Sequence, residues 1–371
     1  MQDFNSELDQ LLLTELAPLE PMPTGKYVVY GAGNIGKEVA VKLARSGRTV
    51  SAFLDVRATG LIDGIPIYSP GSTSALQLAG EGMPVVIGIF NSAVDPMPVQ
   101  ILLDKLGFRR IINFLEFQEH FDLKSHFWLT LRRHVLDSKA QVRAAFKLLS
   151  DDKSRRVFLD AIRLRLAHDS ALLRNPDLEQ QYLPDDLPRP EMPLRLIDGG
   201  AFTGDTLEFF LHKGATFEAV AAFEPDPENF RKLCATVHTN ALGDVVLWPC
   251  GISDTTQVAS FHAGRGLGSV VVADGNMHIQ LVALDEIMPS FRPNYIKLDI
   301  EGSELAALQG GAEMIQKHQP ALAVCVYHHP DHLWTIPLYL RELLPLHRIS
   351  LRYYAFNAFE LVVYAMPVIS A

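Results

Sequence analysis

One glycine-rich loop in the second half of the chain has the residue types of a ligand-binding turn. Glycine lets the backbone turn sharply and approach a ligand closely, and this loop lacks the G-x-G-x-x-G spacing that is typical of pyrophosphate binding. An acid at the strand end can hold a positive group through water or neighbouring backbone. The loop therefore suits a ligand with an amino-acid portion. It follows the strand-like run 194–197 and consists of Asp198, Gly199, Gly200, Ala201, Phe202, Thr203, Gly204 and Asp205.

A second acid follows the next strand-like segment. Glu224 stands in the sequence Phe-Glu-Pro-Asp, directly after the apolar run 219–223. Because the carboxyl ends of parallel strands meet at one edge of a sheet, we expect its carboxylate to face ribose hydroxyl groups. A strand-end acid after an Asp-Gly-Gly-Ala-x-x-Gly turn is the layout of an S-adenosylmethionine site.

Another glycine motif lies near the start of the chain. Gly31, Gly33 and Gly36 follow the strand-like run 26–30 and open a helical pattern, and Asp55 ends the next strand-like run. This context is that of the dinucleotide fingerprint, so the segment could bind NAD or a nucleotide-sugar. It could equally be a Rossmann-like scaffold that binds nothing, since no Tyr-x-x-x-Lys pair or other redox equipment accompanies it. A redox step in this half of the chain stays a further alternative.

The elements around these motifs divide the chain into four segments. Residues 1–24 read as a leader helix and a proline-rich linker, and residues 25–118 as a Rossmann-like domain in which strands alternate with helices. Residues 119–193 have apolar residues at helical spacing and read as a helical connector. Residues 194–371 form a second α/β domain.

Five buried strands are expected in that second domain, followed by an antiparallel closing pair around 347–366. Helices are predicted at about 204–213, 226–238, 304–317 and 332–344, and the glycine-containing segment 256–282 reads as a β-hairpin insertion. The fold class is therefore α/β: a doubly wound sheet, mostly parallel, with an antiparallel last strand, preceded by the smaller Rossmann-like domain.

Composition excludes several classes of function. The chain of 371 residues carries 33 basic and 43 acidic residues and has no Lys/Arg-rich run, so a nucleic-acid partner is not indicated. We expect no membrane span and no signal peptide, because no apolar run is long enough and the N-terminal segment is acidic. Three cysteines without a C-x-x-C motif fit a reducing, cytoplasmic location.

Six motifs in residues 194–371 resemble the FkbM-type methyltransferases, a class I family that uses S-adenosylmethionine to methylate hydroxyl groups. They occur in the family's order along nearly the whole domain. The segment QYLPDDL before them also resembles the lead-in of family members with an extra N-terminal domain. The six motifs are IDGGAFTGDT, AFEPDPENF, PCGISD, VALDEI, YIKLDIEGSELAALQGGA and VCVYHHPDHLWTIPLYL.

The resemblance implies a role for each matching residue. Asp198, Gly200 and Gly204 match the loop on the methionine side, and Glu224 matches the ribose ligand. Ser253 and Asp254 are the polar candidates near adenine. Asp299 ends the fourth strand, where the methyl sulfonium belongs, and Glu301 follows it. Glu304 is interpreted as an acid that complements the dipole of its helix.

A histidine cluster follows the fifth strand. Methyl transfer to an alcohol requires loss of the hydroxyl proton, and histidine can accept one near neutral pH. His328 or His329 could be that general base, or these histidines could shape the acceptor pocket. They could also bind a metal together with His332 and Asp299 or Glu301, although Pro330 interrupts the spacing and we predict no metal site.

The sequence thus predicts an S-adenosylmethionine-dependent O-methyltransferase with a small-molecule or glycan acceptor: a sugar, a glycoconjugate or a polyketide-like molecule. Its predicted catalytic residues are Asp299, Glu301, His328 and His329. The alternative is a nucleotide-sugar-binding protein with an inactive methyltransferase domain.

Overall fold

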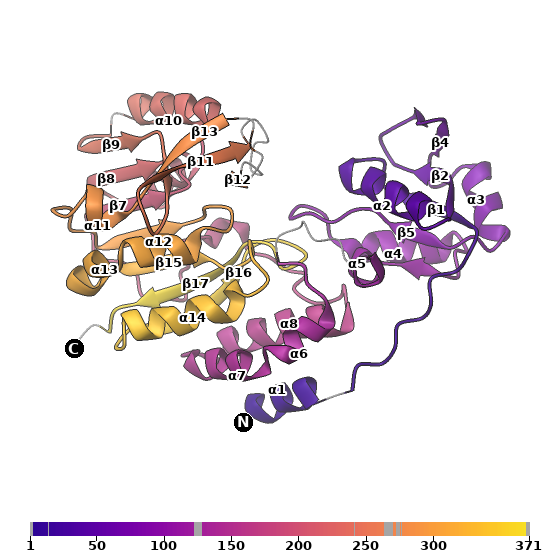
Figure 1. Ribbon diagram of the computed structural model, residues 1–371, viewed down its shortest axis with the longest axis horizontal. Helices are drawn as coiled ribbons and strands as arrows, with labels where there is room; N and C mark the ends of the chain where they lie inside the picture. The colour runs from indigo at the N-terminus through magenta and orange to yellow at the C-terminus, as the bar shows by residue number, and fades with distance from the viewer. Residues whose placement is uncertain are drawn as a thin grey trace. The chain divides into compact units, whose positions relative to one another are not determined.

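The structure is a computed structural model that describes residues 3–13, 15–121, 128–240, 242–262, 270–271, 275 and 277–368. It divides into two compact units (Figure 1). The first comprises residues 1–139, 156–176 and 355–359, and the second comprises residues 140–155, 177–354 and 360–371.

The first unit is built on a six-stranded sheet in the order β3-β4-β2-β1-β5-β6. All neighbouring pairs are parallel except β3 with β4, which confirms the parallel sheet expected from the strand–helix alternation. The strands are β1 (Lys26–Tyr30), β2 (Thr49–Leu54), β3 (Gly60–Ile62), β4 (Ile65–Tyr68), β5 (Val85–Ile87) and β6 (Ile111–Ile112).

The helices before residue 122 belong to the first unit, and those between residues 122 and 193 lie in the predicted connector, which is divided between the two units. The segment 119–193 is helical in its first part, as expected, but its last part contains only the short 3₁₀ helix η1 (Leu178–Gln180). The helices are α1 (Phe4–Leu13), α2 (Asn34–Arg45), α3 (Thr73–Gly80), α4 (Pro96–Lys105), α5 (Phe114–Phe121), α6 (Arg132–Asp137), α7 (Lys139–Leu148) and α8 (Asp152–Ala167).

The second unit contains a seven-stranded sheet in the order β16-β17-β15-β14-β7-β8-β9. β17 runs in the opposite direction to the other strands of this sheet, so the predicted mostly parallel sheet with an antiparallel last strand is confirmed. The strands are β7 (Leu194–Gly199), β8 (Phe217–Phe223), β9 (Val245–Trp248), β14 (Tyr295–Leu298), β15 (Ala321–Cys325), β16 (Arg348–Tyr353) and β17 (Leu361–Met366).

Strand order places a binding site at one edge of this sheet. The chain runs outward from β7 through β8 to β9 and then returns to the other side of β7 with β14. At such a switch point the loops after neighbouring strands diverge, and ligands bind outside the carboxyl ends of the strands. The loops after β7, β8 and β14 are the ones that carry Gly200, Glu224 and Asp299.

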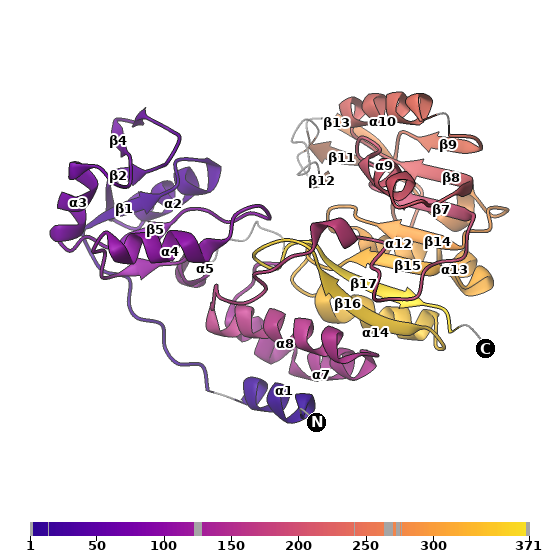
Figure 2. The same ribbon diagram turned by 180° about the vertical axis from the view of Figure 1, so that it is seen from behind.

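Helices cover both faces of the seven-stranded sheet. Figure 1 shows α14 in front of β17, and Figure 2, from behind, shows α9 in front of β7. The helix predicted at 304–317 is two helices, which meet at Gly311. The helices are α9 (Asp205–His212), α10 (Pro227–Thr239), α11 (Leu284–Ile287), α12 (Glu304–Gly310), α13 (Ala312–His318) and α14 (His332–Leu343).

The predicted insertion forms a separate small sheet in the order β10-β13-β11-β12. β11 pairs antiparallel with β13, which confirms the hairpin, and β10 adds a parallel strand. Its strands are β10 (Gly251–Ile252), β11 (Gln257–His262), β12 (Val270–Val271) and β13 (Met277–Val282). Among the residues described, no helix has both the length and the apolar character that crossing a membrane requires.

Candidate active site

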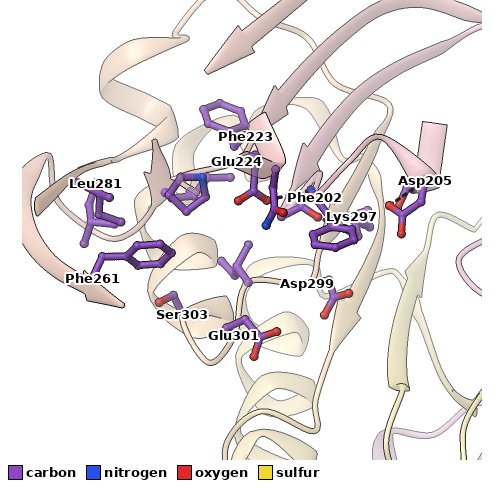
Figure 3. Close-up of a pocket in the computed structure, with 18 of the residues that line it drawn as sticks. Phe202, Asp205, Phe223, Glu224, Phe261, Leu281, Lys297, Asp299, Glu301 and Ser303 are labelled. Atoms are coloured by element: carbon purple, nitrogen blue, oxygen red, sulfur yellow. Dashed lines mark hydrogen bonds between the residues drawn. The ribbon is translucent and has the colours of Figure 1, made fainter. Parts of the chain in front are cut away.

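A cavity lies where β7, β8 and β14 end, as the strand order predicts. Figure 3 shows Leu281 and Phe261 at one end of it, Asp205 at the other, and Glu224 between them. The acidic residues Asp299 and Glu301 line the same cavity along one side. We call the part of the cavity lined by Phe261 and Leu281 its apolar end, and the part lined by Asp299, Glu301 and Glu360 its acidic end.

The glycine loop after β7 is packed tightly against the end of β14. Gly200 has φ +74°, and a Cβ atom there would lie 1.9 Å from the carbonyl oxygen of Asp299. Gly204 also has a positive φ and abuts Thr236. Gly200 and Asp205 line the cavity, whereas Ala201 is buried beneath the loop. Glycine at position 200 is thus required by both the turn and the close approach.

The carboxylate of Asp198 forms an ion pair with a lysine side chain of the protein. Its carboxylate lies 3.1 Å from Nζ of Lys297, and both side chains are almost completely buried. The same Nζ donates hydrogen bonds to the carbonyl oxygens of Gly200 and Gly199, at 2.7 and 3.2 Å. Burial alone would lower the pKa of Lys297, but the charge of Asp198 outweighs it and raises the pKa. The pair therefore stabilises the glycine loop through the hydrogen bonds of Lys297 to its backbone carbonyls.

Glu224 reaches the cavity from the end of β8, where it was expected. Its Oε2 accepts a hydrogen bond from the backbone N–H of Phe202 at 2.9 Å, and Oε1 accepts one from Asp226 at 2.8 Å. Burial raises the pKa of Glu224 to about 7, although these N–H groups act in the opposite direction. The loop after β7 and the start of α10 thus hold this carboxylate in one orientation.

Ser253 and Asp254, which were expected near adenine, are not among the residues that line the cavity. Ser253 is buried, and its hydroxyl donates to Oδ1 of Asp254, which is exposed. Apolar side chains of the small sheet form the wall instead. The sequence pattern identified the insertion but not its part in the cavity, although its alternating apolar residues were a usable signal. The wall residues are Ile252, Phe261, Ile279 and Leu281.

The acidic end of the cavity contains residues that were not predicted. The Tyr182 hydroxyl donates to Oδ2 of Asp299 at 2.8 Å, and Nε2 of Gln181 donates to Oε2 of Glu360 at 2.7 Å. The Tyr327 hydroxyl lies 3.0 Å from Glu360 and 3.3 Å from Asp299. Gln181 and Tyr182 belong to the segment QYLPDDL, whereas no sequence motif marked Glu360.

Two of these acids have raised pKa values. Burial, followed by the charge of Asp299, raises the pKa of Glu360 to about 7. Burial also raises the pKa of Glu301 to about 8, although the charge of His328 opposes it. Carboxylates with pKa values near neutral pH can exchange a proton with a bound ligand.

The two histidines proposed as bases differ in their surroundings. His328 is buried, with Nδ1 2.7 Å from Oε1 of Glu304 and Nε2 3.4 Å from Oδ1 of Asp299. Oε2 of Glu301 lies 3.8 Å from the same Nε2. His329 is exposed and accepts a hydrogen bond from the N–H of Asp331. His328 therefore stands behind the carboxylates that line the cavity.

Glu304 stands in the first turn of α12, where an acid complements the helix dipole, but it also has a second role that the sequence did not indicate. Its side chain is fully buried, and its carboxylate lies 3.1 Å from Nδ1 of His332 besides contacting His328. Its Oε1 also accepts backbone hydrogen bonds from Ile300 and Gly302, so it supports the turn that follows Asp299. The two histidine charges outweigh burial and hold the pKa of Glu304 well below its usual range.

Three side chains near the cavity have potential metal-ligand atoms that lie close together. Ligand atoms of Asp299, Cys325 and Glu360 lie within 4.8 Å of one another. Burial raises the pKa of the Cys325 thiol well above its ordinary value, so the thiolate that a metal requires is disfavoured. This group differs from the histidine set considered from the sequence, because His328 and His332 both face Glu304.

The glycine motif of the first unit is brought together with Asp55 as expected. A Cβ atom on Gly36 would lie 1.9 Å from the carbonyl oxygen of Gly31, so these glycines allow α2 to start close to β1. Gly33 has open space around its Cα. Oδ2 of Asp55 accepts from the N–H of Ala32 at 2.9 Å, and Oδ1 accepts from the turn that follows β2. Packing and turn formation thus account for much of this motif.

Comparison with known proteins identifies a domain within the second unit. Residues 198–354 match the "Methyltransferase FkbM domain". A stretch of 104 residues is 34% identical to "Hexuronic acid methyltransferase AglP" of Haloferax volcanii; this match spans 26% of the chain and 43% of that protein. The fold is similar to that of methyltransferase FkbM from Methylobacillus flagellatus KT, with a TM-score of 0.78, 21% identity and 98% of both chains covered. Residues 198–354 of the chain are thus a methyltransferase domain of the FkbM type.

Proposed function

We propose that this protein transfers a methyl group from S-adenosylmethionine to a hydroxyl group of a sugar, a glycoconjugate or a polyketide-like acceptor. The observation that carries the proposal is the position of Glu224, a buried carboxylate on the cavity wall beside the glycine loop. The FkbM domain supports methyl transfer. The similarity to a hexuronic acid methyltransferase supports a sugar as the acceptor.

The residues of the cavity fit the three parts of S-adenosylmethionine. Glu224 would accept hydrogen bonds from ribose hydroxyls, and the apolar wall around Phe261 and Leu281 would cover the adenine. Gly200 and Asp205 would take the methionine portion at the other side of Glu224. When bound, this cofactor supplies an electrophilic methyl group on a positively charged sulfur.

Glu301 is the best-placed proton acceptor for the acceptor hydroxyl. It lines the cavity, its side chain is about a quarter exposed, and its raised pKa makes it a stronger base than an ordinary carboxylate. Asp299 is held by the hydroxyls of Tyr182 and Tyr327, so it would orient the acceptor beside Glu301.

His328 would hold these acids in place as a cation. The charge of Glu304 outweighs burial and raises the pKa of His328 to about 10, so the imidazole is protonated at neutral pH. A protonated ring cannot take the hydroxyl proton, but its Nε2–H can hold the carboxylates of Asp299 and Glu301.

A transfer assay tests this proposal. The full chain is incubated with S-adenosylmethionine labelled in its methyl group and with a panel of neutral, amino and acidic sugars. We expect label in at least one sugar and strong loss of transfer in Glu301→Gln. If Glu301→Gln transfers label as fast as wild type, Glu301 is not the proton acceptor. If the folded chain does not bind S-adenosylmethionine, the proposed function is contradicted.

A further inference from the structure

The acidic end of the cavity contains more acidic than basic side chains. Asp299, Glu301 and Glu360 all line it. Among the described residues on the cavity wall, Lys297 is the only lysine or arginine, and it is held by Asp198 and two backbone carbonyls. The positive charge of His328 is shared with the buried Glu304. When ionised, these three carboxylates are thus balanced only by the imidazolium of His328, whose Nε2 lies 3.4 Å from Asp299 and 3.8 Å from Glu301.

We propose that Asp299, Glu301 and Glu360 form a cation-selective end of the cavity, which binds the sulfonium of the methyl donor in preference to the uncharged sulfur of the product. This inference rests on the proposed function. It adds a property that the family assignment does not supply: the donor would bind more tightly than S-adenosylhomocysteine, which would leave readily after transfer.

The placement of the donor follows from the two ends of the cavity. With ribose at Glu224 and adenine against Phe261 and Leu281, the sulfur would be placed away from Phe261, on the side of the cavity where Figure 3 shows Asp299. A positive charge near carboxylates favours their ionised form, and the effect is stronger where water is partly excluded. The uncharged thioether of the product gains nothing from these charges.

The hydrogen bonds around the acids keep them in place without neutralising them. Glu360 receives hydrogen bonds from the neutral groups of Gln181 and Tyr327. Asp299 receives one from Tyr182, which is also neutral. These bonds fix the carboxylate oxygens close together, and the single charge of His328 relieves only part of their mutual repulsion.

Proton release provides a second readout of this selectivity. The charged groups that face Glu301 are His328, Asp299, Glu304 and Glu360. With pKa values of about 8 for Glu301 and about 7 for Glu360, both acids are partly protonated near neutral pH. A bound cation would lower both pKa values, so donor binding would release protons and product binding would not.

Calorimetric titration of the full chain tests the inference. S-adenosylmethionine, S-adenosylhomocysteine and sinefungin, in which a protonated amine replaces the sulfonium, are each titrated at pH 7.5 in phosphate and in Tris. Because these buffers differ in ionisation enthalpy, the difference in heat gives the protons released. We expect the two cations to bind about tenfold more tightly than S-adenosylhomocysteine, the ratio that one unit of pKa shift represents, and to release protons.

Variants then assign the effect to the acids. We expect a smaller ratio between the affinities for the two cations and for S-adenosylhomocysteine in Glu360→Gln and in Glu301→Gln. Thermal melting verifies that each variant is folded. Glu179→Gln, which removes an exposed carboxylate outside the cavity, should keep the wild-type preference. Equal binding of all three nucleosides without proton release would overturn the inference and leave the proposed function standing. No binding of any of them to the folded chain would overturn both.

Discussion

The Nδ1 atom of His328 lies 2.7 Å from Oε1 of Glu304, and neither side chain has more than 1% of its surface exposed. The carboxylate also contacts His332 and the backbone of the turn after Asp299. A histidine in this position is part of a buried charge pair, and the acids in front of it are the groups that can meet a substrate. The histidine motif therefore contributes to the site by organising its carboxylates.

Breaking this pair should destabilise the protein in a pH-dependent way. The pKa of His328 is raised, so its contribution is complete below about pH 6.5 and is lost as pH rises through about 10. The pKa of Glu304 is lowered from 4.5, so its contribution is complete above that value and is lost in acid. Glu304→Gln should thus cost about 3–5 kcal/mol of unfolding free energy, most clearly at pH 5–6.5.

Urea unfolding of wild type and Glu304→Gln across pH 5–10 checks this prediction. Glu342→Gln, which changes an exposed acid on α14, is the control and should behave like wild type at every pH. A difference between wild type and Glu304→Gln that stays constant up to pH 10 would mean that His328 is not held as a cation.

The reaction should depend on ionised Glu301. Because the pKa of Glu301 is raised to about 8, kcat/KM should increase with pH and level off above that value. Glu301→Gln should lower kcat by about 10²–10⁴-fold, the usual contribution of a general base. His329→Ala, which changes an exposed ring, should retain most of the turnover. Full activity of Glu301→Gln together with an inactive His329→Ala would instead assign the proton transfer to His329.

The glycine loop offers a matched pair of substitutions. Gly200 and Gly214 both have positive φ values, +74° and +78°, but only Gly200 has a neighbouring atom where a Cβ would be placed. Gly214→Ala should cost about 1–2 kcal/mol of unfolding free energy through backbone strain alone. Gly200→Ala should cost more and should weaken cofactor binding, because the new Cβ displaces the carbonyl of Asp299. Equal losses in thermal unfolding would show that the loop can move away from β14.

The glycine motif of the first unit should be separable from cofactor binding. Asp55 accepts its hydrogen bonds from Ala32 and from the turn after β2, all within the first unit. We therefore expect Asp55→Ala to leave the affinity for S-adenosylmethionine unchanged in calorimetry. A loss of affinity in the folded variant would mean that this aspartate takes part in the cofactor site.

Several elements could be predicted because local patterns determine them. The strand-like run Tyr295–Leu298 and the glycine loop at Gly200 are examples, because their residue types favour a strand and a turn. Residues at strand ends, such as Glu224 and Asp299, then meet at one edge of the sheet because parallel strands bring their carboxyl ends together.

The rest depends on long-range packing, which a single sequence does not reveal. Glu304 has the spacing of an acid in the first turn of a helix, and only the approach of His328 makes it a buried anion. Glu360 joins Asp299 because β17 lies next to β15, a pairing between distant parts of the chain. Phe261 lines the cavity because the insertion folds against it, which alternation alone could not indicate.

Titration of S-adenosylmethionine into wild type and Glu224→Ala is the most direct test of the central claim, that this cavity is the cofactor site. Glu218→Ala, at the other end of the same strand and exposed, is the control. Hydrogen bonds to a charged acceptor contribute about 1.5–3 kcal/mol, so Glu224→Ala should bind about ten- to a hundredfold more weakly while Glu218→Ala binds like wild type. Unchanged affinity in a folded Glu224→Ala, or no saturable binding to wild type, would contradict the account.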